Sequence, residues 1–114
     1  MATFRLFSSV ENTLEDIWSY SYGRWGEEQA NRYIHDLYRC MDQLAANRLR
    51  WRETPQSLCV PRDITHKVYF HHHQRHYVFF RELQAGDIGI LSIVHDAMDV
   101  PVRLARDLEA LPLK

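Results

Sequence analysis

The run Ile88-Gly89-Ile90-Leu91-Ser92-Ile93-Val94-His95 is nearly all apolar and is rich in β-branched residues. A strand with one face in water alternates apolar and polar residues, whereas a strand that is covered on both faces is apolar along its whole length. We therefore expect residues 88–95 to form a strand at the centre of a β-sheet, with other elements packed against both of its faces.

Two further strand-like runs lie upstream of this segment. Residues 75–83 alternate between apolar and polar side chains, and residues 67–71 are aromatic and β-branched. Gln84-Ala85-Gly86-Asp87 has the composition of a turn and predicts a hairpin between residues 75–83 and 88–95. A short alternating run at residues 3–7 predicts one more strand near the N-terminus.

The first half of the chain has the periodicity of helices. Apolar residues recur at helical spacing over residues 30–45, and a second stripe runs through residues 10–25. Gly26 lies between them and can adopt the left-handed conformation that ends a helix. Two amphipathic helices joined by so short a break predict an antiparallel hairpin, with Trp18 and Trp25 on its buried side.

Particular residues mark where helices begin and where the chain leaves regular structure. Ser8 and Glu11 have the S-x-x-E spacing of a capping box, in which each side chain bonds a backbone N–H at a helix start. Asp99 can cap a last helix that has Pro101 in its first turn, where the missing N–H costs nothing. Residues 50–65 show no periodicity and contain two prolines, which predict a loop.

These elements follow the order β-α-α-β-β-β-α, which predicts an α+β fold. In this fold an N-terminal helical hairpin packs on a small, mostly antiparallel sheet. The chain of 114 residues contains no internal repeat and no interdomain linker. A chain of this length can bury roughly two-thirds of its unfolded surface around one core, so we expect residues 1–114 to form a single domain.

The composition is that of a soluble globular protein, with 46% hydrophobic and 25% charged residues. No apolar run approaches the roughly 20 residues that cross a bilayer, and the N-terminus lacks the charged and apolar blocks of a signal peptide. We therefore expect a cytoplasmic protein that stays out of the membrane. In that compartment Cys40 and Cys59 are expected to be free thiols.

Charge is unevenly distributed along the chain, although the formal net charge is only −1. Residues 48–81 contain seven basic and two acidic residues, whereas residues 11–42 contain seven acidic residues and three arginines. A basic segment in a neutral protein can mark a surface for an acidic partner, or it can be the solvated edge of a sheet. The count alone leaves both interpretations open.

Five histidines lie close together in the sequence: His66, His71, His72, His73 and His76. His71 and His73 share one face of a strand, a spacing that can chelate zinc. No cysteine or carboxylate stands beside them in the sequence to complete a tetrahedral set, and no cofactor-binding motif is present. We therefore expect no metal and no cofactor, and we place the histidines at a solvent-facing end of a hairpin.

His95 and Trp51 are the single residues with the clearest chemical potential. His95 can act as a general base or acid on an RNA 2′-hydroxyl, with Arg81 and Lys67 stabilising the pentavalent phosphate. Alternatively, its imidazole bonds the following turn and holds the last helix in place. Trp51 can stack on a base or fill a pocket of a partner, or it can cover the open edge of the sheet.

Residues 77–83 and 88–99 resemble the closing segment of ParE-type toxins, in which a hydrophobic strand leads into an I-L-H-x-R-M-D ending. The upstream helices are similar too. Residues 14–20 and 26–30 resemble the family's "DL-x-x-I-x-x-Y" and "W-G-x-x-Q-A" segments, so the match spans nearly the whole chain in the same element order.

Three residues match the ending and one departs from it. His95, Met98 and Asp99 occupy motif positions, whereas Ala97 stands where the motif commonly has arginine. Basic residues are also fewer than in many RelE-type nucleases, and the last helix carries no tyrosine or histidine. The second departure argues against a nuclease, and the first raises the alternative of an inactive toxin.

The resemblance implies a toxin encoded in one operon with a small antitoxin. The tail of the antitoxin is expected to wrap the toxin, with a helix in an apolar groove and often an added strand at the sheet edge. ParE-type toxins poison DNA gyrase by binding, without known catalysis of their own. RelE-type toxins share the fold but cut messenger RNA on the ribosome.

We therefore expect a gyrase inhibitor held in a toxin–antitoxin hetero-oligomer. The residues expected to bind the target are Arg103, Arg106, Arg81 and Trp51. One alternative is a ribosome-dependent endoribonuclease that uses His95, Arg81 and Lys67. The other is an inactive toxin that is retained as an antitoxin-binding protein or corepressor.

Overall fold

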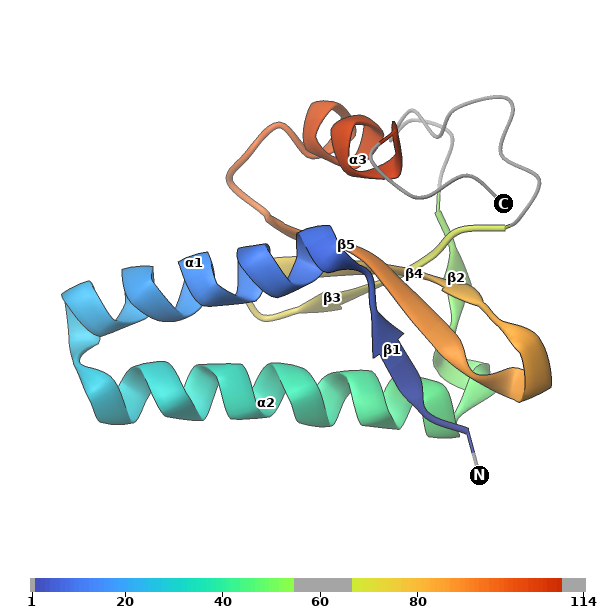
Figure 1. The fold of residues 1–114 in the computed structure, drawn as a ribbon, viewed down its shortest axis with the longest axis horizontal. Helices are drawn as coiled ribbons and strands as arrows, with labels where there is room; N and C mark the ends of the chain where they lie inside the picture. The colour runs from blue at the N-terminus through green and yellow to red at the C-terminus, as the bar shows by residue number, and fades with distance from the viewer. Residues whose placement is uncertain (1, 55–66, 110–114) are drawn as a thin grey trace.

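Five strands form one mixed sheet in the order β1-β5-β4-β3-β2. The computed structural model describes residues 2–54 and 67–109, and Figure 1 shows how the helices cover the sheet. The strands are β1 (Phe4–Leu6), β2 (Arg52–Glu53), β3 (Tyr69–His73), β4 (His76–Glu82) and β5 (Ile88–His95). The helices are α1 (Ser8–Trp25), α2 (Glu27–Ala46) and α3 (Val100–Glu109). The expected α+β arrangement is therefore confirmed.

Strand β5 is interior and is covered on both faces, as its composition predicts. It pairs in parallel with β1 and in an antiparallel ladder with β4. Ile90 and Ile93 pack in one cluster with α1 and α2, whereas Leu91 and Val94 pack in a second cluster with α3. The sheet thus lies between the helical hairpin and α3, and every ladder except β1–β5 is antiparallel.

Helices α1 and α2 form the expected antiparallel hairpin (Figure 1). Gly26 joins them with a φ of +92°, a conformation that favours glycine, and its carbonyl accepts the Ala30 N–H. The apolar stripe of α2 is buried at Ala30, Leu37, Cys40, Met41, Leu44 and Ala45. None of the three helices described combines the length and apolarity that crossing a bilayer requires.

The start of α1 differs from the expected capping box. Helix α1 begins at Ser8, with Phe7 in the N-cap position and no side-chain cap hydrogen bond. The Phe7 N–H donates to the Ile90 carbonyl at 3.2 Å, and the Phe7 carbonyl accepts the Val10 N–H at 2.9 Å. Phe7, which is held by β5, takes the N-cap position in place of Ser8. The helix therefore starts one residue earlier than it would with Ser8 as its cap. The capping-box prediction was wrong.

A short edge strand occupies part of the segment expected to be a loop. Arg52 pairs with Phe70 and Glu53 with Tyr69, so β2 extends the sheet beyond β3. Two residues are too few to show a period, and only the neighbouring strand reveals them. The prolines of the expected loop, together with Cys59 and His66, lie outside the described residues.

Helix α3 is capped as expected and is anchored by a buried polar pair. The Asp99 carboxylate accepts the Val102 N–H at 3.4 Å, and Leu104 and Leu108 are buried. Behind them, the Ser92 hydroxyl of β5 donates to the Asp107 carboxylate at 2.5 Å. Both partners are buried, so each satisfies the other in a place that water does not reach.

The Ser92→Ala variant should lower the free energy of unfolding by about 1–2 kcal/mol, because the Asp107 carboxylate would stay buried without this donor. Urea denaturation followed by circular dichroism measures the change. Ser19→Ala is the matched control, since Ser19 is exposed on α1. Equal stability of the two variants would contradict the role of the buried pair.

Candidate binding site

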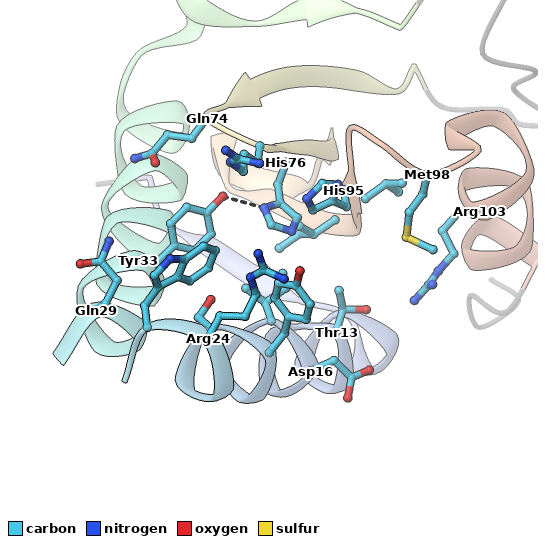
Figure 2. A pocket seen from close by; sticks show the side chains of 17 residues that line it. Thr13, Asp16, Arg24, Gln29, Tyr33, Gln74, His76, His95, Met98 and Arg103 are labelled. Atoms are coloured by element: carbon cyan, nitrogen blue, oxygen red, sulfur yellow. Dashed lines mark hydrogen bonds between the residues drawn. The ribbon is translucent and has the colours of Figure 1, made fainter. Parts of the chain in front are cut away.

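A pocket of about 730 Å³ opens where the free end of the helical hairpin faces the β3–β4 turn and the start of α3. Figure 2 shows its lining, which comes from both hairpin helices, from β4 and β5, and from the segment that leads into α3. The buried residues Ile17, Ile93 and Val94 give it an apolar inner side. The site is thus assembled from elements that are far apart in the sequence.

The rim of the pocket is aromatic because the hairpin extends past the sheet (Figure 1). Trp25, at the end of α1, is 56% exposed, which corrects the expectation that it lies in the core. The sheet ends before it, so the helical stripe has nothing left to pack against. Trp18 is half-buried, and its indole N–H donates to the Asn31 side chain of α2 at 2.8 Å.

Positive charge dominates the pocket lining. Three arginines, Arg24, Arg75 and Arg103, are opposed by the single carboxylate of Asp16. The Arg24 guanidinium lies over the Tyr20 ring at 5.6 Å. The Nε atom of Arg103 is buried and has no hydrogen-bond partner within the described ranges. Arg103 nevertheless forms an ion pair with Asp107, whose Oδ1 atom lies 3.5 Å from that Nε atom. Arg24 and Arg75 are therefore the pocket cations that have no carboxylate partner among the described residues.

A neutral pair of side chains forms the wall beneath the β3–β4 turn. The Tyr33 hydroxyl lies 2.6 Å from Nδ1 of His76 (Figure 2). Burial, reinforced by the nearby His95, lowers the pKa of His76 to about 4, and burial raises the pKa of Tyr33. Both groups are therefore uncharged near neutral pH, and a hydrogen bond joins the phenol to the imidazole.

The expectation that the histidines face solvent was wrong for His76, which is only 8% exposed. His76 begins β4 directly under the hairpin, where α2 covers it. His72 is exposed and lies 3.3 Å from the Asp96 carboxylate. His71 and His73 are half-buried. The described residues contain no group of three His, Cys, Asp or Glu side chains that could hold a metal ion.

His95 makes the hydrogen bond to the following turn that was one of its two expected roles. Its Nδ1 atom accepts the Ala97 N–H at 3.0 Å, which fixes the turn between β5 and α3. Its ring stands nearly perpendicular to that of His76, with the centroids 5.0 Å apart. Met98 follows in the same turn, is exposed and lines the pocket, while Asp99 caps α3.

Comparison with known proteins identifies the family. The model described as "ParE toxin of type II toxin-antitoxin system, parDE" matches residues 5–100, which run from β1 to the first residue of α3. The chain belongs to the ParE toxin family. The match includes His95, Met98 and Asp99, and it covers every pocket residue except Arg103.

Two relatives illustrate the similarity. Toxin ParE1 of Mycobacterium tuberculosis is 29% identical over 97 residues, which cover 85% of this chain and 92% of the relative. Toxin ParE1 of Caulobacter vibrioides is 40% identical over 45 residues, which cover 40% of this chain and 47% of the relative. As a type II toxin of the ParE family, the chain has a cognate antitoxin as its partner.

The nuclease set that the sequence suggested for this ParE toxin is not brought together. His95 ends β5, whereas Arg81 pairs with Gly89 near the opposite end of that strand. Six residues of extended chain separate the two positions, which is roughly 20 Å. Lys67 precedes β3 on the Arg81 side and pairs with Glu53 at 3.1 Å. Arg81 itself lies over the Phe7 ring at 5.5 Å.

Of the remaining expected contact residues of this ParE toxin, Trp51 is committed to internal packing. Its indole N–H donates to the Leu44 carbonyl at 2.6 Å, and its ring packs edge-on against Phe80 at 5.5 Å. The Trp51 ring therefore packs over side chains of the sheet. Arg103 lines the pocket, whereas Arg106 is exposed on α3.

Sequence reasoning missed several pocket residues, chiefly Arg24, Arg75 and Tyr33. They come from α1, the β3–β4 turn and α2, so no spacing links them. Cys40, in contrast, is a free and buried thiol. Burial raises its pKa to about 11, which keeps it protonated and unreactive.

Proposed function

We propose that this ParE toxin inhibits DNA gyrase by binding to it in the bacterial cytoplasm, with no chemistry of its own, and that its antitoxin neutralises it. Family membership supports the toxin role. The observation that favours binding over RNA cleavage is the separation of His95 from Arg81 and Lys67 along the sheet. General acid–base catalysis needs such groups within hydrogen-bond reach of the same reacting atoms.

The exposed side of α3 is the surface that we assign to the target. Arg106 and Val102 are exposed there, and Arg103 lies on the same helix beside the pocket. Arginine and apolar side chains on one helix are typical of protein interfaces, in which a few residues carry most of the binding energy. Trp51 is left out of this surface because its indole is used inside the protein.

We expect micromolar toxin to reduce supercoiling by purified gyrase and to trap a cleavage complex. Arg106→Ala should weaken this inhibition about tenfold, because an interface arginine typically contributes more than 1 kcal/mol. Arg39→Ala is the control, since Arg39 is exposed on α2, away from α3. If folded toxin at micromolar concentration left gyrase supercoiling unchanged, the proposed gyrase inhibition would be refuted.

Two measurements detect the alternatives. Primer extension on translated messages would reveal cuts at codon positions if the protein were a ribosome-dependent nuclease. Harmless overexpression together with tight antitoxin binding would indicate an inactive toxin, the reading that Ala97 in the motif raises. If the protein is an active gyrase inhibitor, we expect neither codon-positioned cuts nor harmless overexpression.

A further inference from the structure

We propose that the pocket of Figure 2 binds a free adenine nucleotide, with arginines holding the phosphate and with aromatic and amide side chains holding the base. The inference goes beyond the proposed inhibition of gyrase and does not depend on it. Its support comes from arginines without carboxylate partners, an aromatic rim, two side-chain amides, and a volume that suits a small molecule.

The arginines predict an anionic group in the ligand. Arg24 and Arg75 form no ion pair with any carboxylate in the part of the chain that the structure describes. The Arg24 guanidinium lies over the rings of Tyr20 and Trp25, 5.6 and 5.4 Å from their centroids. Contact with ring faces orients a guanidinium without using its N–H donors. Because such donors bind two oxygens of one phosphate in parallel, a phosphate suits this site.

The aromatic rim predicts a flat ring in the same ligand. Trp25 and Tyr20 are 56% and 59% exposed, and both line the pocket together with Arg24. Nucleobases stack on tryptophan and tyrosine rings and on guanidinium planes, because every base has a π-face. A bare inorganic anion makes no use of such surfaces. The rim and the arginines together therefore favour a ligand that joins a planar base to a phosphate.

Two side-chain amides indicate which base the pocket recognises. Gln29, in the first turn of α2, and Gln74, in the β3–β4 turn, lie toward the same end of the pocket as Tyr33 (Figure 2). The neighbouring pair of Tyr33 and His76 is uncharged near neutral pH, so this end offers hydrogen bonds without charge. A glutamine amide is both donor and acceptor, and it matches N6 and N7 of adenine. Adenine is therefore the base that we assign.

The size and the surroundings of the pocket favour a single nucleotide over a nucleic-acid strand. Its volume of about 730 Å³ lies within the roughly 300–1,000 Å³ of small-molecule sites. Residues 11–42 carry seven acidic residues, most of them exposed, and three arginines, so the positive pocket lies beside an acidic surface. A strand needs a continuous basic track along its phosphates. A free nucleotide needs only the contacts inside the pocket.

Isothermal titration calorimetry of the full-length toxin with AMP tests the inference. We expect saturable one-to-one binding, with adenosine and inorganic phosphate each at least about tenfold weaker, because each makes only part of the contacts. CMP should also bind about tenfold more weakly, because cytosine lacks the N6–N7 edge. The double variant Gln29→Ala, Gln74→Ala should remove this preference for AMP. CMP binding as tight as that of AMP to the unchanged toxin would overturn the assignment of adenine.

A pair of double variants locates the phosphate. Arg24→Ala, Arg75→Ala should weaken AMP binding at least about tenfold, because charge-assisted hydrogen bonds are lost. The control is Arg5→Ala, Arg39→Ala, which removes the same charge at exposed positions outside the pocket. It should bind AMP within about threefold of the unchanged toxin. Thermal unfolding verifies that both variants are folded.

A pair of single variants locates the base. Trp25→Ala should weaken AMP binding about tenfold, because a stacking surface is lost. Tyr22→Ala is the control, since Tyr22 is 51% exposed on the same helix and lies outside the pocket. Equal losses in the two variants would contradict stacking on the rim.

The remaining outcomes that would overturn the inference are distinct. One is no binding of AMP up to about 5 mM by the folded protein. Another is phosphate binding as tight as that of AMP, or AMP binding that the arginine variant leaves unchanged. The last is a single-stranded RNA of about 20 nucleotides that binds at least 100-fold more tightly than AMP and loses this affinity in the arginine variant. Gyrase takes no part in these titrations, so failure of the proposed function is distinguishable from failure of this inference.

Discussion

Replacing Phe80 by alanine should lower the free energy of unfolding by about 3–5 kcal/mol. Phe80 is fully buried on the hairpin side of the sheet, where it packs against Trp51 and Tyr69 at ring distances of 5.5 and 5.8 Å. Alanine would leave a cavity that the strand ladder on both sides of β4 prevents from closing. The loss is a large share of the roughly 5–15 kcal/mol that stabilises a domain.

Urea denaturation, followed by tryptophan fluorescence, measures this loss, since Trp51 reports directly on the site. Leu49→Ala is the control, because Leu49 is 96% exposed and should change the stability by less than about 0.5 kcal/mol. A loss below about 1 kcal/mol for Phe80→Ala would be incompatible with the packing of the hairpin on β4.

Acidification should destabilise the protein through His76. Its pKa is about 4 in the folded state, against an ordinary histidine pKa of 6.5. Below the unfolded value the unfolded chain takes up a proton that the folded chain refuses, so stability falls as the pH drops towards the folded pKa. From about pH 8 to about pH 4.5 this one group should remove about 2–3 kcal/mol of stability.

The groups around His76 define the test of this pH dependence. His95 and His73 disfavour its charged form, whereas Asp96 favours it. The pKa values of His71 and His73 are also lowered, so they act in the same direction. His76→Gln keeps a polar group near Tyr33 and should remove most of the pH dependence in urea denaturation. A variant that loses stability as steeply as the unchanged protein would refute the assignment.

The elements of the fold could be predicted because their signals are local. The apolar run of residues 88–95 specified an interior strand, and the stripe of residues 30–45 specified α2, because side-chain direction follows the period of each element. Gly26 and Asp99 marked helix ends through their own chemistry. The capping box failed because the hydrogen bond between Phe7 and Ile90 joins residues that are distant in the sequence.

The candidate site could be predicted only in fragments. His95, Met98 and Arg103 were singled out from the sequence, and all three line the pocket. Arg24 and Arg75 were not, because they are assembled from α1 and the β3–β4 turn. Spacing carries no information about residues that meet across separate elements.

The sequence by itself determined the strands, the helices and their order, since periodicity and turn residues act within a few positions of the chain. Only the tertiary structure decided which side chains share a surface. Strand register placed Arg81 at the end of the sheet remote from His95, and the overhang of the hairpin exposed Trp25 at the rim of the pocket. The physical reason is that register and helix docking are set by packing between elements, which no single segment of sequence contains.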